Sequence, residues 1–436
     1  MARADVTSGT YVEPRAYRLM DGRLSQDRLD VAGIPALPGI DSTVQLLANG
    51  YLFGERGFDR VQGDAFHTRL LGRRVTVLRG LEAVRFFYEG GRFDRSHGSV
   101  PRSAVHLLQD EGSVQTLEGS QHAERKILFL GLLGSEEARQ ELLEAVNREW
   151  IQAATGSAGV PQPMLEFTTG VLARAVQRWM GIAPESVSSL SAGELASMVN
   201  NAGAAGVPNW AARARRVASE RKARELIRGA RQSQLASGRL RDLAFFEEGG
   251  TRLPEEVAAI ELLNILRPTV AVARYLTFAA LAVYRNPRAH QMATGTDLER
   301  RSVAEEVRRF FPFFPVIGGK ATRDLEWQGA PIREGSWVMV DLYGTDHHSA
   351  LWESPRRFMP ERHLNPVRAR SIVAQGTGDL STTHHCPGQS LTSDLIALGL
   401  QLLTRGPAYA VPPQDFRVSL RRLPTAPQDG FVVSFI

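Results

Sequence analysis

The sequence predicts a mainly α-helical protein with a minor β component, folded as one large domain. Segments with helical periodicity fill residues 120–310, whereas short β-branched runs such as RRVTVLRG precede them or follow residue 310. The composition is that of a globular protein, with 43% apolar and 23% charged residues. No repeat, low-complexity tract or linker interrupts the chain. We therefore expect an irregular lead-in at residues 1–40 and a single domain at residues 41–436.

The elements follow one another in a consistent order. The region before residue 100 mixes helical DSTVQLLANGY with the strand-like RRVTVLRG. Four amphipathic helices are then expected, separated by Gly, Pro and Ser. Their sequences are HAERKILFLGLLG, EEARQELLEAVNREWIQAA, LEFTTGVLARAVQRWMGI and VASERKARELIRGARQSQ. After the Pro-rich turn FFPFFPVIGG, short strands are expected in DLEWQG and SWVMVDLYG, and the C-terminal tail is rich in β-formers.

Charge and hydropathy exclude several classes of function. The net charge is +5, yet the most basic run, residues 213–241, contains acids and lacks the aromatic residues that stack on bases, so nucleic-acid binding is not expected. The N-terminus carries no apolar signal segment. The chain lacks the run of about 18 apolar residues that a membrane span requires. We expect a cytoplasmic protein without a membrane span.

Cys386 is the only cysteine, so it cannot form an intramolecular disulfide. Pro387 suits the first position of a helix, and an apolar stripe follows at helical spacing: Leu391, Leu395, Leu398 and Leu402. A sulfur at the start of a helix is favoured as a thiolate, which is a nucleophile or a metal ligand. The alternative is a small buried structural thiol.

Residues 254–287 predict a long, mostly buried helix that contains an unusual pair, Arg267-Pro268. Proline inside a helix removes a hydrogen bond and typically costs about 3 kcal/mol. The preceding arginine is a cation among apolar residues, with no carboxylate within one helical turn. A buried guanidinium requires an anion, and its planar fork fits a carboxylate. Either a substrate carboxylate or a distant acid of the chain supplies that anion, or the side chain reaches solvent.

Two further groups gain significance from their order. Glu306 and Arg309 form an E-x-x-R pair, followed by Arg362 in PERH and by Cys386 in HHCPG. A glutamate between two arginines is able to brace the loop that carries the cysteine. Upstream, one helical turn places His122, Arg125 and Lys126 together, either as a surface basic cluster or as donors to an anionic cofactor edge.

With these motifs in this order, the sequence resembles a cytochrome P450, and more narrowly the bacterial fatty-acid peroxygenases. The similarity runs from about residue 40 to near the C-terminus and includes GSQHAERKILFL, ILRPTVAVARYLTFAALAV, DLYGTDHHSALWESPRRFMPER and HHCPG. The resemblance implies the cytochrome P450 fold around a buried haem b. It implies that Cys386 is the proximal thiolate ligand of the iron. It also implies that Glu306, Arg309 and Arg362 are structural.

The resemblance further implies a use of hydrogen peroxide to hydroxylate a carboxylic acid at its α or β carbon, without a redox partner. Arg267 and Pro268 then occupy the catalytic position where ordinary members carry an acid and an alcohol. Arg267 would hold the substrate carboxylate as the acid-base group, and Gln115 matches a distal residue. His122 and Arg125 match positions that contact the haem propionates, and Phe313 and Phe314 match a turn that lines the substrate channel.

The sequence departs from its relatives at two positions. His385 stands where an arginine commonly holds a propionate, and Gln109 stands where an aromatic pocket residue is common. These differences leave open a non-fatty carboxylic acid from specialised metabolism as the substrate. Two other interpretations also remain: a monooxygenase supplied by ferredoxin and a reductase, and a haem-binding sensor without turnover.

Overall fold

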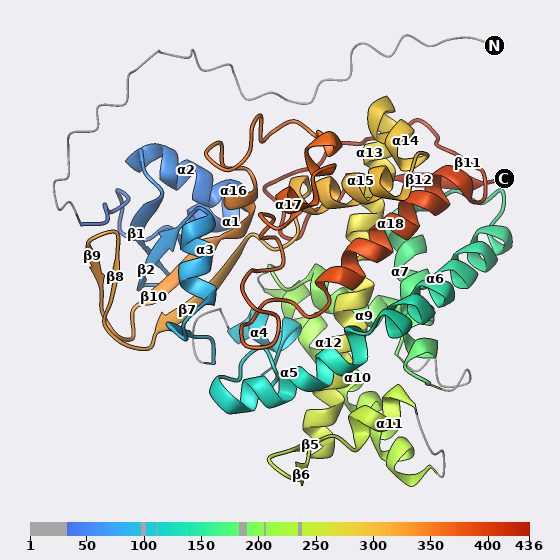
Figure 1. Cartoon of the computed structure of the whole chain (residues 1–436), viewed down its shortest axis with the longest axis horizontal. Coiled ribbons are helices and arrows are strands. Elements are labelled where there is room, and N and C mark those ends of the chain that lie inside the picture. The colour runs from blue at the N-terminus through green and yellow to red at the C-terminus, as the bar shows by residue number, and fades with distance from the viewer. Residues whose placement is uncertain (1–32, 97–101, 111, 183–189, 205, 234–237) are drawn as a thin grey trace.

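The computed structural model describes residues 33–96, 102–110, 112–182, 190–204, 206–233 and 238–436 (Figure 1). The described helices of the first half are α1 (Thr43–Asn49), α2 (Leu52–Val61), α3 (Leu81–Tyr88), α4 (Arg102–Leu108), α5 (Gly119–Leu133), α6 (Glu136–Gly156), α7 (Met164–Trp179), α9 (Ala192–Asn200) and α10 (Val207–Gln232). Those of the second half are α11 (Arg239–Ala244), α12 (Glu255–Ala271), α13 (Ala273–Arg285), α14 (Pro287–Ala293), α15 (Asp297–Phe310), α16 (Leu342–Asp346), the 3₁₀ helix η1 (Pro360–His363), α17 (Pro366–Ala369) and α18 (Gln389–Arg405).

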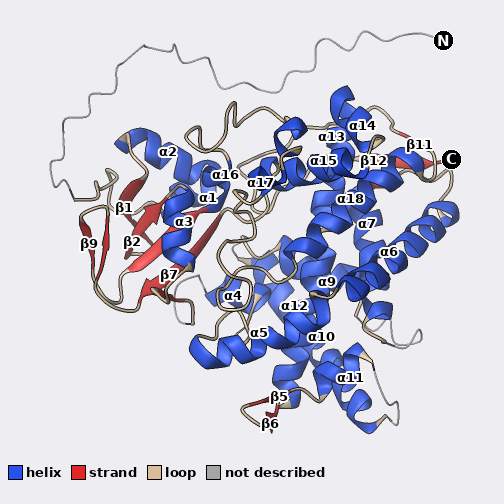
Figure 2. Ribbon diagram, viewed as in Figure 1, coloured by secondary structure: helices blue, strands red, loops and turns tan. Residues whose placement is uncertain are grey.

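The strands lie mainly on one side of the molecule, away from the helical bundle (Figure 2). They are β1 (Ala65–Leu70), β2 (Arg73–Leu78), β3 (Phe93–Asp94), β4 (Gln162–Pro163), β5 (Glu247–Glu248), β6 (Thr251–Arg252), β7 (Val316–Ala321), β8 (Leu325–Trp327), β9 (Ala330–Ile332), β10 (Trp337–Asp341), β11 (Tyr409–Ala410) and β12 (Val432–Phe435). The largest sheet has the order β1-β2-β10-β7-β3, in which only β10 and β2 pair in parallel. The mainly α prediction with minor β is confirmed.

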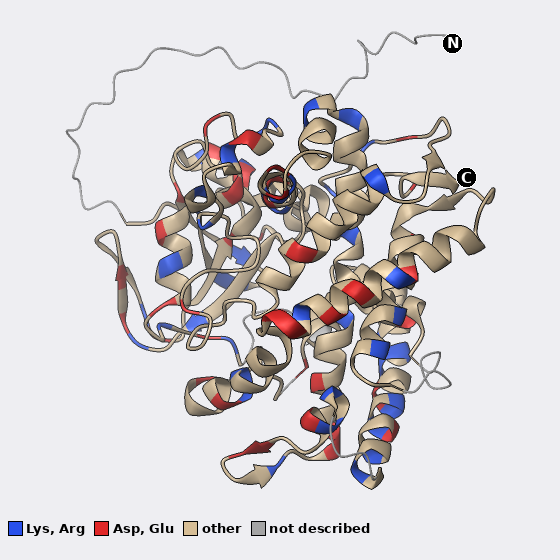
Figure 3. Ribbon diagram, turned by 45° about the vertical axis from the view of Figure 1, so that its right-hand side comes forward, with Lys and Arg blue, Asp and Glu red and all other residues tan. Residues whose placement is uncertain are grey.

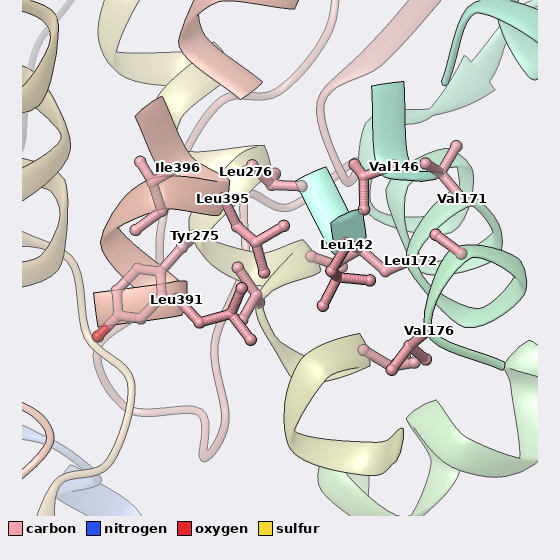
Figure 4. Packing of buried hydrophobic residues seen from close by; sticks show 14 of the residues in the cluster. Leu142, Val146, Val171, Leu172, Val176, Tyr275, Leu276, Leu391, Leu395 and Ile396 are labelled. Carbon is pink, nitrogen blue, oxygen red and sulfur yellow. The ribbon is translucent and has the colours of Figure 1, made fainter. Parts of the chain in front are cut away.

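The main hydrophobic core joins helices that are distant in sequence. Leu142 of α6, Leu172 of α7, Leu276 of α13 and Leu395 of α18 are almost completely buried in one cluster (Figure 4). The apolar stripe predicted after Cys386 faces this cluster, with Leu398 partly buried at its edge. Helix α18 is therefore fixed along its length, which fixes the loop that precedes it.

Two boundaries differ from the sequence predictions. Helix α18 begins at Gln389 with Gly388 as its N-cap, two residues later than the predicted start at Pro387. The helix predicted from Pro254 is divided at Val272 into α12 and α13, and Pro268 lies inside α12. Most of the predicted lead-in, residues 1–32, lies outside the described residues, whereas Ala36 pairs with His67 of β1.

The surface carries both signs of charge. Figure 3 shows Lys and Arg interspersed with Asp and Glu along the helices. In the described part of the chain, no helix combines the length and the apolar character needed to cross a bilayer.

Candidate active site

A cavity of about 260 Å³ lies between α12 and the loop that precedes α18. Its lining brings together nine residues singled out in the sequence, namely Gln109, Gln115, His122, Lys126, Arg267, Pro268, Phe313, Phe314 and Cys386. These residues come from five separate segments of the chain. Two other predicted site residues, Arg125 and His385, do not belong to the lining.

Cys386 faces the cavity from a loop held by hydrogen bonds. Its backbone N–H donates to the carbonyl of Gln375 (3.1 Å), and the Gln375 amide lies 3.9 Å from Sγ as a donor. Arg308 in turn donates to Gln375 Oε1 (2.9 Å). Burial raises the pKa of the Cys386 thiol, although the Gly388 N–H, Lys126 and Arg308 oppose the rise. The predicted preference for thiolate at a helix start is thus outweighed by desolvation, and a bound cation would reverse the balance.

Glu306 forms the centre of a buried brace that ties α15 to the segment 359–363. It pairs with Arg309 at 2.8 Å and with Arg362 at 3.3 Å, as the motif order suggested. His363, which was not predicted from the sequence, adds a contact at 2.9 Å, and the Met359 N–H donates at 2.8 Å. These donors outweigh the desolvation of the carboxylate and lower the pKa of Glu306 to about 2.

Arg267 lies 2% exposed in the opposite wall of the cavity. Its guanidinium caps the end of α4 by donating to the carbonyls of Leu107 (3.2 Å) and Leu108, two groups that helix geometry leaves without a helical partner. It also donates to Asn264 Oδ1 at 2.8 Å. Among the described residues no carboxylate forms an ion pair with it. Burial, with repulsion from Arg216, lowers the pKa of Arg267 well below its usual value, so an anion nearby would stabilise its charge.

Glu261, one turn before Asn264, is the nearest upstream acid on α12, and its carboxylate is already occupied. It accepts from Arg125 (2.7 Å), from the Val114 N–H (2.9 Å) and from Asn264 (2.9 Å). Asn264 also donates to Gln115 Oε1 at 3.2 Å. One buried acid therefore fixes the orientation of Asn264, which in turn contacts both Arg267 and Gln115.

A polar edge of the cavity is formed by His122, Lys126 and His384. The rings of His122 and His384 lie 4.1 Å apart, and Lys126 Nζ donates to the carbonyls of Thr383 (2.6 Å) and His385 (2.5 Å). Burial lowers the pKa of His122 to about 3 and that of Lys126 to about 8. Burial also lowers the pKa of His384 well below its usual value, so at neutral pH this edge presents one ammonium group and two neutral imidazoles.

Two expected cofactor contacts are placed elsewhere in the structure. Arg125 is bound by Glu248 (2.8 Å) and Glu261 and does not line the cavity. His385 points to the Gly378 carbonyl (2.8 Å) and Gln389 (2.5 Å), whereas its neighbour His384 lines the cavity. Arg125 lies away from the cavity because it neutralises two carboxylates, the buried Glu261 and the partly buried Glu248. The exchange of His385 for His384 follows from the loop conformation.

The remaining predicted pocket residues form one end of the cavity. Phe313 stacks on Tyr275, with ring centroids 4.7 Å apart, and Phe314 lies beside it at 5.0 Å. Phe313 packs against the core, whereas Phe314 is 42% exposed. Tyr275 was not predicted from the sequence; its buried hydroxyl finds no hydrogen-bond partner among the described residues. Asn264, Gln375 and His384 were not predicted either, and the helical spacing of Asn264 and Arg267 was the one available signal.

A helix-rich fold with a cysteine loop, a buried E-x-x-R brace and a long helix across the cavity defines the cytochrome P450 class. The family model for cytochrome P450 matches residues 300–392. Pluviatolide synthase of Podophyllum peltatum is 34% identical over 76 residues, 17% of this chain and 16% of that protein. The probable cytochrome P450 127A1 of Sinorhizobium fredii is 28% identical over 165 residues, 38% of this chain and 37% of that protein. The chain thus aligns with well under half of the length of each of these two curated relatives.

Solved structures match almost throughout. Cytochrome P450EX alpha (CYP152N1), solved with myristic acid, is 34% identical with a TM-score of 0.86, covering 92% of this chain and 98% of that chain. Cytochrome P450SP alpha (CYP152B1) in complex with (R)-ibuprophen is 33% identical with a TM-score of 0.85, covering 91% and 98%. Ligand-free cytochrome P450 OleT is 27% identical with a TM-score of 0.87, covering 92% and 99%. The chain belongs to the cytochrome P450 family and resembles its CYP152 branch.

The cavity fits the haem b that this family implies. One thiol faces it, and apolar side chains of Phe129, Leu133 and Leu391 line the walls beside a polar edge of Lys126, His122 and His384. A flat apolar macrocycle with two carboxylates on one side has the same distribution of polarity. Cys386 would ligate the iron, and Lys126 and the two histidines would lie at the carboxylate side.

Proposed function

We propose that this cytochrome P450 is a peroxygenase that uses hydrogen peroxide to hydroxylate a fatty-acid-like carboxylic acid at the α or β carbon, in the cytoplasm and without a redox partner. The observation that carries the proposal is the buried Arg267 in the cavity wall, which has no ion-pair partner among the described residues. Support also comes from the CYP152 structures, one of which was solved with myristic acid.

The haem supplies the oxidising iron centre when it is bound. Arg267 supplies the anion site, because its described contacts engage three of its five N–H donors. A substrate carboxylate held there would stabilise the guanidinium charge and would place the α and β carbons nearest the anchor. The same carboxylate would accept and return the proton of hydrogen peroxide, a role that ordinary members give to a protein acid. Asn264, fixed by Glu261, keeps both Arg267 and Gln115 in place.

The direct test compares Arg267→Gln with Arg274→Gln. Arg274 lies on α13, the helix that follows α12, and it is buried as well. It also donates to a carbonyl, that of Thr425 at 2.8 Å, but it does not line the cavity. Hydrogen bonds to charged groups contribute about 1.5–3 kcal/mol each. Losing the two that the guanidinium would form with the substrate carboxylate predicts a fall of about 100-fold or more in peroxide-dependent kcat/KM. Shifts of the Soret band on adding a carboxylic acid substrate should disappear only in Arg267→Gln. The carbon monoxide difference spectrum of that variant should be retained. Full activity in that variant would refute the anchor.

The same preparation separates the alternatives. Turnover with ferredoxin and reductase, but none with peroxide, would identify a conventional monooxygenase. Acid binding without turnover in either system would identify a sensor.

A second substrate class is an aryl-substituted carboxylic acid. Phe313 and Phe314 place two aromatic rings at one end of the cavity, Gln109 adds a polar group, and cytochrome P450SP alpha has been solved with (R)-ibuprophen. A panel of alkyl and arylpropionic acids, compared by Soret titration and peroxide-dependent product, decides between the classes. Tighter binding and faster turnover of the alkyl series would rule out the aryl preference.

A further inference from the structure

Exposed apolar side chains gather on α1 and on the turn between β1 and β2. Ile40, Val44 and Leu47 are 90%, 77% and 53% exposed, and their spacing places them along one side of α1 and the residues before it. Leu71, in the turn, is 62% exposed. Isolated exposed apolar residues are ordinary, but a group on one surface indicates an interaction site.

The turn is fixed rigidly to α1. The Leu71 N–H donates to Thr43 Oγ1 (2.6 Å), and the Gly72 N–H donates to the Asp41 carboxylate (2.7 Å). Leu71 and Gly72 both have positive φ, 52° and 74°. Asn or Gly would suit a turn of this type better than leucine, because a side chain with a Cβ rarely adopts the left-handed conformation. A leucine at position 71 thus strains the backbone of the turn and exposes an apolar side chain to water. This exposed side chain points to contact with an apolar phase.

A second group of exposed apolar side chains, consisting of two residues, lies at the start of α10. Val207 and Trp210, one turn apart, are 71% and 65% exposed. The segment 419–425 connects this pair to α1: the Tyr51 N–H donates to the Leu420 carbonyl (2.9 Å), and a Cβ at Gly203 would lie 2.7 Å from the Leu423 carbonyl. We call the combined surface the docking face; its residues are Ile40, Val44, Leu47, Leu71, Val207 and Trp210.

Arginines flank each part of the docking face. The exposed ones are Arg69, Arg73 and Arg74 on the β1–β2 hairpin, Arg421 and Arg422 on the connecting segment, and Arg213 and Arg215 on α10. Asp41, the acid beside α1, has its carboxylate occupied by backbone N–H groups of Thr43 and Gly72. Apolar side chains and a tryptophan among arginines are typical of a protein that lies on an anionic lipid surface. A second copy of the chain would bring arginine against arginine, which opposes association.

The docking face also adjoins the cavity. Tyr51, which lies between α1 and α2, donates its hydroxyl to the Phe313 carbonyl (2.7 Å), and the next residue, Phe314, is both a cavity-lining residue and 42% exposed. An amphiphilic acid dissolved in a membrane would therefore meet the cavity at the side on which the protein docks.

We propose that this enzyme binds peripherally to anionic lipid membranes through the docking face. Helix α1 and the rigid Leu71 turn enter the interface together with Trp210, and the flanking arginines contact lipid phosphates. This proposal concerns membrane attachment and holds whether or not the cavity performs the proposed peroxide chemistry.

The test measures partitioning of the full-length holoprotein to phosphatidylcholine vesicles with and without phosphatidylglycerol. We expect stronger binding to the anionic vesicles, weakening with salt, and quenching of Trp210 by brominated lipid. Leu71→Asn, which favours the turn, combined with Trp210→Ala should lower the partition coefficient at least tenfold. Val367→Asn, at a 62% exposed position on α17, is the matched control and should bind as the parent protein does. Soret titration with a soluble acid should be the same in all variants.

Three outcomes would overturn the proposal. The first is equal binding of the double variant and the parent, and the second is an equal loss in Val367→Asn. The third is a parent protein that does not bind vesicles but forms a dimer that Leu71→Asn disrupts, which would make the face an interface between copies. Failure of the peroxide assay together with normal vesicle binding would leave membrane attachment supported and would count against the proposed chemistry alone.

Discussion

Lys126 joins two functions in one side chain, because it lines the cavity and holds the carbonyls on either side of His384. Replacing it with methionine keeps most of the side-chain volume but removes two charge-assisted hydrogen bonds, each worth about 1.5–3 kcal/mol. We expect Lys126→Met to retain less haem after gel filtration and to lose part of the thiolate signature in its carbon monoxide difference spectrum.

Lys222→Met is the control for this variant. Lys222 is half-exposed and pairs with Glu194 at 2.9 Å, and neither of these residues lines the cavity. Equal haem retention in the two variants would show that Lys126 does not hold the cysteine loop.

Single residues also show where sequence interpretation reaches its limit. The order of Glu306, Arg309 and Arg362 along the chain was sufficient to predict that the glutamate pairs with both arginines. Arg125 was not predictable, since its acids lie 123 and 136 residues further along the chain. His384 and His385 are adjacent and chemically identical, so only the loop conformation decides which one faces the cavity.

At the scale of elements, α18 depends on a close approach to α13. A Cβ at Gly399 would lie 2.3 Å from Leu276 Cδ2, whereas one at Gly229, inside α10, would meet no atom within 4 Å. Gly399→Val should therefore lower the free energy of unfolding by roughly 1–3 kcal/mol and weaken haem retention, because α18 positions the Cys386 loop.

Gly229→Val carries the same change without the contact, and thermal unfolding of the two variants is the measurement. A common midpoint for both would mean that α18 can move without loss, and that the packing of the two helices does not fix the loop.

The elements themselves were largely predictable. Strong periodicity placed α5, α6, α7 and α10, and Pro268 marked the unusual helix. The start of α18 was wrong by two residues because Pro387 is acceptable both as a first helical residue and in the turn before the helix. The carbonyl cap that Arg267 provides for α4 joins residues about 160 positions apart, which no local pattern reveals.

At the scale of the whole molecule, buried acids make stability depend on pH in both directions. Burial raises the pKa of Asp341 and of Asp346 to about 7, so their contribution to stability is complete below pH 4 and is lost as pH rises through 7. The pKa of Glu306 is lowered to about 2, so its contribution is present above pH 4.5 and is lost toward pH 2. We expect maximal stability at mildly acidic pH.

Urea unfolding at pH 5.5 and 8.5 measures this effect, at about 1.4 kcal/mol per pKa unit for each group. The variant Asp341→Asn should reduce the loss at pH 8.5, since the Asn oxygen can still accept from the Gly344 N–H (2.6 Å). A loss at pH 8.5 that is unchanged in this variant would assign the alkaline limb to other groups.

The capping of α4 by Arg267 limits how this enzyme can be redesigned. A variant meant to accept a neutral substrate would replace the arginine with an apolar residue, and it would then leave the carbonyls of Leu107 and Leu108 buried without donors. With Arg267 in its proposed role as substrate anchor, substrate scope and the folding of α4 are therefore coupled. A successful change of head-group preference requires a second substitution that supplies a neutral donor to the end of α4.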